Sequence, residues 1–147
     1  MSELRELYQE TILEHSRKPR NFGILETANH KAEGYNPLCG DHYTVFLDVK
    51  DGAIQNLSFE GSGCAISKAS ASMMTQSLKG KTMAEAEALF TKFHDLVTGH
   101  GDSAEEMGKL AVFGGVSEFP LRVKCATLAW HTLRAALRGE QQAVSTE

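Results

Sequence analysis

An alternation of apolar and polar residues on both sides of an Asp51-Gly52 pair constrains the fold of this chain more than any other feature. The apolar positions are Tyr43, Val45, Leu47 and Val49 before the pair, and Leu57 and Phe59 after it. This alternation, with Phe46 as the one exception on the polar face, predicts two half-buried strands, and Asp-Gly favours a two-residue hairpin turn because both residues tolerate a positive φ. Ile54 is out of phase with the second strand, which predicts a β-bulge there.

Two of the three cysteines flank this predicted hairpin. Cys39 lies about two residues before the first strand and Cys64 about three residues after the second. Antiparallel pairing therefore places both near the same end of the sheet. Cys125 lies at or near a predicted helix start. The odd count argues against a disulfide framework, and 147 residues suffice to form a core without such cross-links.

The other segments predict helices and one further strand. Apolar periodicity and helix-capping residues predict helices over residues 3–15, 65–79, 82–99 and 120–138, with a capping box from Thr82 to Glu85. A second capping box, Ser103 to Glu106, predicts another short helix, and residues 30–35 predict a short strand. We expect an α+β fold, with a small antiparallel sheet of about three strands packed by helices on one side. We also expect a single domain over residues 1–147, with a frayed tail over residues 140–147.

Composition and charge argue against several classes of protein. The net charge of −4 offers no field that attracts nucleic acid or an anionic membrane. No apolar run approaches the roughly 18 residues that a membrane-spanning helix needs. The first residues are acidic and amphipathic, unlike a signal peptide. With three free thiols, these features predict a cytoplasmic protein.

The surroundings of the cysteines favour reactive thiolates. Cys64 follows Gly61-Ser62-Gly63 at a predicted helix N-terminus, where the helix dipole favours negative charge. Asp41 lies two residues after Cys39, so both side chains share one face of an extended segment. Together with Cys125 they offer three sulfurs and one oxygen. Tetrahedral zinc accepts such a set, whereas lasting iron–sulfur clusters usually have four thiolates. Any one of these cysteines taken alone also fits the role of a small buried apolar residue.

The histidines add little to this site. Only His42, on the polar face of the first hairpin strand, lies close to it in the sequence. His15, His94 and His100 are expected on helix faces or at the surface, and His131 is expected to be structural.

Four segments together resemble the NifU N-terminal domain family of iron–sulfur cluster assembly proteins. They are Pro19–Gly23, Cys39-Gly40-Asp41, Gly61–Ser67 and Arg122–Ala126, so the resemblance covers nearly the whole chain. It implies a SufE/NifU-like α+β fold with a three-stranded sheet. Within the family the chain is similar to the SufU branch rather than the IscU scaffold branch. The stretch around residues 82–115 is added, Lys124 stands where scaffold members carry histidine, and the proline-rich chaperone motif is altered over residues 119–124.

The resemblance implies a function in sulfur transfer. Cys39, Asp41, Cys64 and Cys125 would bind one zinc ion. The partner would be a SufS-type pyridoxal-phosphate cysteine desulfurase, and Cys39 would accept its persulfide sulfur. Arg122 would assist docking or stabilise a thiolate, and SufBCD-type proteins would act downstream. Such a protein is a sulfurtransferase-like persulfide acceptor rather than a conventional enzyme.

Three other interpretations remain open at this stage. The first is a scaffold that binds iron and assembles a labile, transferable [2Fe-2S] cluster. The second is a zinc-stabilised binding module without sulfur chemistry. The third, a thiol hydrolase with a Cys39–histidine pair, has only His42 to serve it.

Overall fold

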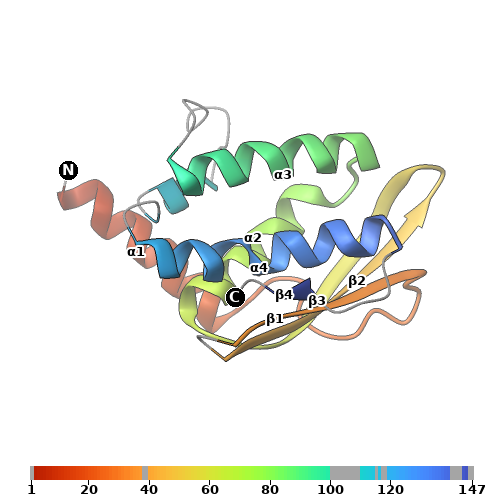
Figure 1. The fold of residues 1–147 in the computed structure, drawn as a ribbon, viewed down its shortest axis with the longest axis horizontal. Helices are drawn as coiled ribbons and strands as arrows, with labels where there is room; N and C mark the ends of the chain where they lie inside the picture. Colours follow the sequence, from red (N-terminus) through yellow and green to blue (C-terminus); the bar gives the residue numbers. More distant parts are fainter. Residues whose placement is uncertain are drawn as a thin grey trace.

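The structure is a computed structural model that describes residues 2–37, 40–99, 110–114, 116, 119–139 and 144–145, with the backbone alone for 2–8 and 144–145. Figure 1 shows the elements in chain order. They are α1 (Ser2–Arg17), β1 (His30–Asn36), β2 (Asp41–Lys50), β3 (Ala53–Ser62), α2 (Ala65–Leu78), α3 (Met83–Thr98), α4 (Pro120–Leu137) and β4 (Val144–Ser145). The predicted α+β class is confirmed.

The sheet is built on the predicted hairpin. Its strand order is β3-β2-β1-β4, and the first three strands are antiparallel neighbours. Asp51 and Gly52 have φ values of 55° and 76°, as a turn with two left-handed residues requires. Val49 pairs with Ile54 whereas Asp48 pairs with Asn56, so the register shifts at the predicted bulge.

A short parallel strand extends the sheet beyond β1. Val144 and Ser145 pair with Gly34 and Tyr35. The edge of β1 presents backbone groups that a further strand can pair with, and the fraying expected from residue 140 stays a prediction. The other residues of the tail lie outside those that the structure describes.

Local capping explains where the helices begin and end. Cys64 is the N-cap of α2, and Gly80 follows that helix with a φ of 85°. The capping box between Thr82 and Glu85 is present at α3, and Gly99 ends that helix in the left-handed conformation. The second predicted capping box, Ser103 to Glu106, lies outside the described residues.

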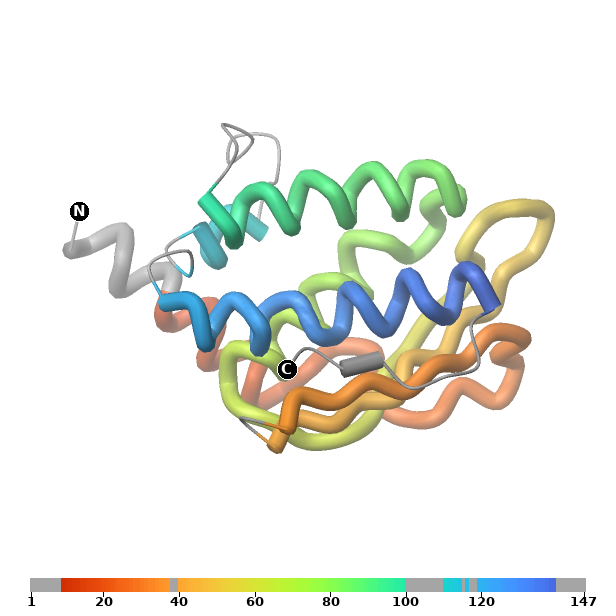
Figure 2. The backbone as a smooth tube through the Cα atoms, viewed as in Figure 1, coloured from red at the N-terminus to blue at the C-terminus, as the bar shows by residue number. Residues whose placement is uncertain are grey.

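The helices form layers on one side of the sheet. In Figures 1 and 2, α4 crosses over the sheet and α3 runs along α4 on the side away from it. Contacts join α4 to β1 and β2, α2 to β3 and α4, and α1 to α2. The Phe93 ring stacks on the Trp130 ring with centroids 4.5 Å apart, which joins α3 to α4. No helix within the described ranges is long and apolar enough to cross a membrane.

A buried polar contact fixes α4 against α2. Trp130 Nε1 donates to Ser70 Oγ, and Ser70 Oγ donates to the Ala126 carbonyl. These bonds hold the second turn of α4, which carries Cys125, close to the start of α2.

Candidate metal centre

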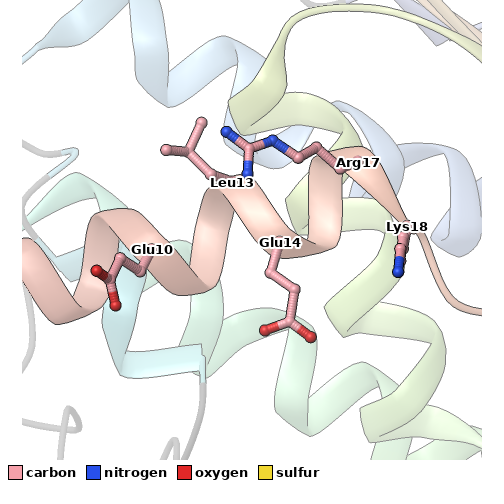
Figure 3. A pocket seen from close by; sticks show the side chains of 5 residues that line it. All are labelled: Glu10, Leu13, Glu14, Arg17 and Lys18. Carbon is pink, nitrogen blue, oxygen red and sulfur yellow. The ribbon is translucent and has the colours of Figure 1, made fainter.

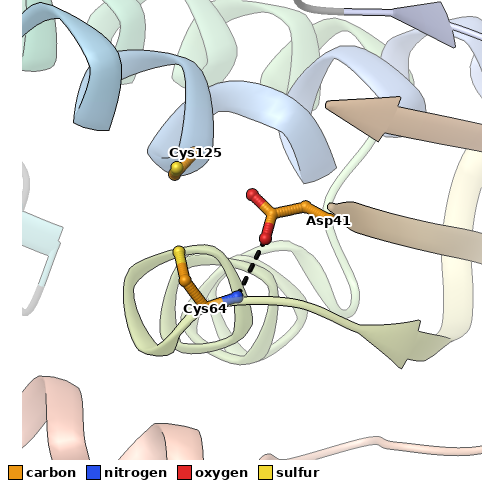
Figure 4. A group of neighbouring side chains, drawn as sticks. All are labelled: Asp41, Cys64 and Cys125. Carbon is orange, nitrogen blue, oxygen red and sulfur yellow. Dashed lines mark hydrogen bonds between the residues drawn. The ribbon is translucent and has the colours of Figure 1, made fainter. Parts of the chain in front are cut away.

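Three of the four predicted ligands meet at one point of the fold. One ligand atom from each of Asp41, Cys64 and Cys125 lies within 4.8 Å of the other two. They come from the start of β2, the N-cap of α2 and the second turn of α4. Figure 4 shows the carboxylate and both sulfurs directed toward one shared space. Cys39, the fourth predicted ligand, lies outside the described residues.

Asp41 is almost fully buried, with 1% of its surface exposed. Its Oδ1 accepts a hydrogen bond of 2.8 Å from the Cys64 backbone amide, drawn in Figure 4. Its Oδ2 is buried and has no hydrogen-bond partner among the residues that the structure describes. A buried carboxylate oxygen left without a partner is costly unless a cation neutralises it.

The surroundings of Cys64 favour its thiolate. Its Sγ accepts a hydrogen bond of 3.5 Å from the Ser67 backbone amide at the N-terminus of α2. The pKa of Cys64 falls from 9.0 to about 5, chiefly through a hydrogen bond from the Cys125 thiol and then through the bonds from Ser67. Burial and the nearby Asp41 charge act in the opposite direction. Because the thiolate is the form that binds metal, Cys64 is prepared for this role at neutral pH.

Cys125 is fully buried in α4, and its Sγ lies 3.6 Å from the Leu121 carbonyl oxygen one turn earlier. Its sulfur also accepts a hydrogen bond of 3.8 Å from Asn36 Nδ2. The sequence analysis did not identify Asn36. The available signal was its place in Asn36-Pro37-Leu38-Cys39, immediately before the predicted site.

A second row of polar atoms lies behind Cys64 and Asp41. Tyr43 is fully buried, and its hydroxyl forms a hydrogen bond of 2.8 Å with Ser67 Oγ. Burial raises the pKa of Tyr43, so this hydroxyl stays protonated. A Cβ added at Gly63 would lie 2.5 Å from both Asp41 Oδ1 and the Tyr43 hydroxyl. Gly63 is therefore required by close packing against the site.

Two predicted contributors remain at the margin. Arg122 is exposed on the first turn of α4, one turn before Cys125. His42 is exposed, and its ring lies against Tyr35 with centroids 6.4 Å apart. Because side chains alternate along β2, His42 lies on the face opposite to Asp41.

The remaining histidines have structural surroundings. His131 packs edge-on against Phe90 between α4 and α3, with centroids 5.2 Å apart, as expected for a structural residue. Burial lowers the pKa of His131 to about 4. His15 lies on the face of α1 that packs on α2, as the helix-face alternative predicts; it is 5% exposed and forms a hydrogen bond of 2.8 Å with Ser72 Oγ. His94 is partly exposed, and His100 lies outside the described residues.

A separate hollow along α1 has a different character. Figure 3 shows its lining, and all five side chains come from α1 or the residue that follows it. They are Glu10, Leu13, Glu14, Arg17 and Lys18. This lining carries charges of both signs and one leucine, with no sulfur or imidazole ligand.

Comparison with known proteins agrees with this geometry. The model of the NifU-like N-terminal domain family matches residues 7–139. The chain belongs to this family. Its predicted membership is therefore confirmed.

Members of both functional branches of the family are similar over nearly the whole chain. "Zinc-dependent sulfurtransferase SufU" of Bacillus subtilis is 38% identical, over 92% of this chain and 92% of that protein. "Iron-sulfur cluster assembly scaffold protein IscU" of Streptococcus pyogenes is 37% identical, over 94% of this chain and 87% of that protein. The crystal structure of a putative iron–sulfur cluster assembly scaffold protein for the SUF system of Fervidobacterium islandicum superposes with a TM-score of 0.84. It is 34% identical and covers 90% of this chain and 98% of that one.

Proposed function

We propose that this protein takes part in iron–sulfur cluster assembly as a zinc-dependent sulfur acceptor. Cys39, Asp41, Cys64 and Cys125 would hold the zinc, and Cys39 would receive sulfur from a SufS-type pyridoxal-phosphate cysteine desulfurase. The observation that carries the proposal is the buried Asp41 Oδ2, which lies beside two cysteine sulfurs and has no hydrogen-bond partner within the described part of the chain. The name of the Bacillus subtilis relative supports both the zinc and the sulfur transfer.

The donor set suits zinc. Two sulfurs and a carboxylate oxygen already lie within 4.8 Å of one another. Cys39 is two residues before Asp41, so the chain keeps the α-carbons of these residues within about 7 Å of each other. A fourth ligand from Cys39 would complete a tetrahedral set, and bound zinc would keep its sulfur deprotonated and shielded.

The anchoring of the other two cysteines supports Cys39 as the acceptor. Cys64 caps α2 and Cys125 is fully buried in α4, so movement of either sulfur would disturb a helix. Cys39 instead belongs to the connection between β1 and β2. Its thiolate would attack the terminal sulfur of the desulfurase persulfide, whose S–S bond breaks as a new one forms on Cys39. The desulfurase cysteine would leave as a thiolate.

Three further features belong to the proposal. Arg122, exposed one turn before Cys125, would assist docking of the desulfurase or stabilise a thiolate. SufBCD-type proteins would receive the sulfur for cluster assembly. Reduced thiols are required throughout, which favours a cytoplasmic location.

A scaffold for a labile [2Fe-2S] cluster is the second candidate. The same ligands would bind it, and replacement of one thiolate by Asp41 suits a cluster that is passed on. The similarity to the scaffold protein of Streptococcus pyogenes favours this candidate.

Metal content and desulfurase stimulation separate these functions. The protein is purified without added metal, and sulfide release by a SufS-type desulfurase is measured with wild type, Cys39→Ala and Arg122→Ala. About one zinc per chain, with stimulation that is lost in Cys39→Ala, is the expected result. Iron with acid-labile sulfide and little stimulation would transfer the assignment to the scaffold. Bound zinc that stabilises the fold, with no persulfide on Cys39, would indicate a binding module instead.

A further inference from the structure

Asn36 occupies a junction between the strands that carry the metal centre. It is the last residue of β1 and pairs with Asp41, the first residue of β2. Its carbonyl accepts a hydrogen bond of 2.9 Å from the Gly40 amide. Its side chain is fully buried. The backbone of Asn36 is thus fixed at the position from which its side chain reaches α4.

The side-chain amide of Asn36 faces a sulfur atom. Nδ2 donates to Cys125 Sγ over 3.8 Å. An amide nitrogen is a donor only, and a sulfur accepts best as the metal-binding thiolate. Cys64 has a corresponding donor in the Ser67 backbone amide, at 3.5 Å. Each of the two described sulfurs therefore receives an amide hydrogen bond, one from the backbone and one from Asn36.

We propose that Asn36 is a positioning residue of the metal centre, whose Nδ2 donates to the metal-bound Cys125 thiolate and holds that sulfur toward Asp41 and Cys64. The inference rests on the proposed function, since it needs a metal at this site. Partners that orient metal ligands typically contribute about 10- to 100-fold to metal affinity. Loss of the Asn36 donor should weaken zinc binding by a similar factor.

Nuclear magnetic resonance can detect this bond directly. Cadmium-113 replaces zinc in nitrogen-15-labelled wild-type protein, and scalar coupling from cadmium to amide protons is measured across N–H···S hydrogen bonds. The expected result is coupling to the Asn36 side-chain amide as well as to the Ser67 backbone amide. A purely structural asparagine would show no coupling to the metal.

The Ser67 amide separates failure of this inference from failure of the proposed function. Coupling to Ser67 without coupling to Asn36 would overturn the role of Asn36 and leave the metal centre intact. Failure to bind cadmium through thiolates would overturn the proposed function, and the inference with it. Both outcomes are read from the wild-type protein, so they do not depend on whether a variant folds.

Matched variants then measure the contribution. Asn36→Asp keeps the side-chain shape but removes the donor, and Asn21→Asp makes the same change where Nδ2 donates to Thr75 Oγ1, away from the cysteines. Chelator competition should show zinc affinity lowered about 10- to 100-fold in Asn36→Asp and unchanged in Asn21→Asp. Equal zinc affinity in the two variants would contradict the proposal.

Discussion

Replacement of Gly63 by alanine would add a single methyl group among atoms that hold the metal centre. Its Cβ would lie 2.5 Å from Asp41 Oδ1, 2.5 Å from the Tyr43 hydroxyl and 2.6 Å from Ser67 Oγ. Real Cβ contacts are longer than 3.0 Å, so at least one of these groups must move. Gly63 does not have a positive φ, so the substitution introduces no backbone strain of its own. The effect of the change is therefore steric.

The expected loss of stability follows from two opposing effects. Overpacking of a tight site costs about 1–3 kcal/mol. Alanine also has less conformational freedom than glycine in the unfolded chain, which raises the free energy of unfolding by about 0.4–1 kcal/mol. Gly63→Ala should therefore lower the free energy of unfolding by about 0.5–2 kcal/mol, and Tm by roughly 1–8 °C. Displacement of Asp41 should also weaken zinc binding.

Gly114→Ala provides the matched control. Among the described residues, a Cβ at Gly114 would meet Leu96 Cδ1 alone, at 3.5 Å, an ordinary contact, and this glycine also lacks a positive φ. It should be neutral or stabilise the fold by up to about 1 kcal/mol. Urea unfolding of the metal-free proteins measures stability, and chelator competition measures zinc affinity. Equal stability and equal zinc affinity in both variants would refute the packing argument.

Three other changes test the electrostatics of the fold. Asp41→Asn keeps an acceptor for the Cys64 amide but removes a buried charge. Urea unfolding should therefore show the metal-free protein stabilised by about 1–3 kcal/mol, while zinc binding weakens at least about tenfold. A loss of stability in the metal-free protein would contradict this prediction. The pKa of Cys64 falls from 9.0 to about 5, so its contribution to the stability of metal-free protein is complete above pH 9.0 and lost as the pH falls through about 5. Cys64→Ser should flatten the pH dependence of unfolding across that window, and an unchanged slope would count against the thiolate. The pKa of His131 is lowered to about 4 from 6.5, so its neutral form stabilises the fold above pH 6.5 and this contribution is lost as the pH falls toward 4. His131→Phe should make acid unfolding, measured by circular dichroism, begin at a lower pH than in the wild type. An unchanged onset would show that protonation of His131 does not contribute to acid unfolding.

Features that depend on neighbouring residues were predictable from the chain alone. The Asp51-Gly52 turn, the bulge at Ile54 and the capping box at Thr82 each require only a short stretch of sequence, because backbone dihedral preferences and local hydrogen bonds determine them. Antiparallel pairing of the two hairpin strands then predicts that Cys64, after the second strand, lies at the same end of the sheet as Asp41, where the first strand begins.

Side-chain contacts between elements could not be predicted from the sequence. The stretch around His15 has the pattern of a helix face, but only the packing of α1 on α2 shows that this histidine is buried against Ser72. The same holds for Gly63, whose need to be glycine depends on Tyr43 and Asp41 in another element. The partner of each residue in these contacts lies in another element, so no local pattern identifies it.

By itself, the sequence determined the ligand types, the hairpin and the likeness to a family of iron–sulfur assembly proteins, because these depend on residue identity and short-range order. Only the tertiary structure decided that Cys125, 61 residues after Cys64, reaches the same point, since that depends on the packing of α4 across α2 through Ser70 and Trp130. It also decided that one oxygen of Asp41 is buried without a partner among the described residues, and that Asn36 faces a sulfur. Those properties arise from several elements at once, and no local pattern encodes them.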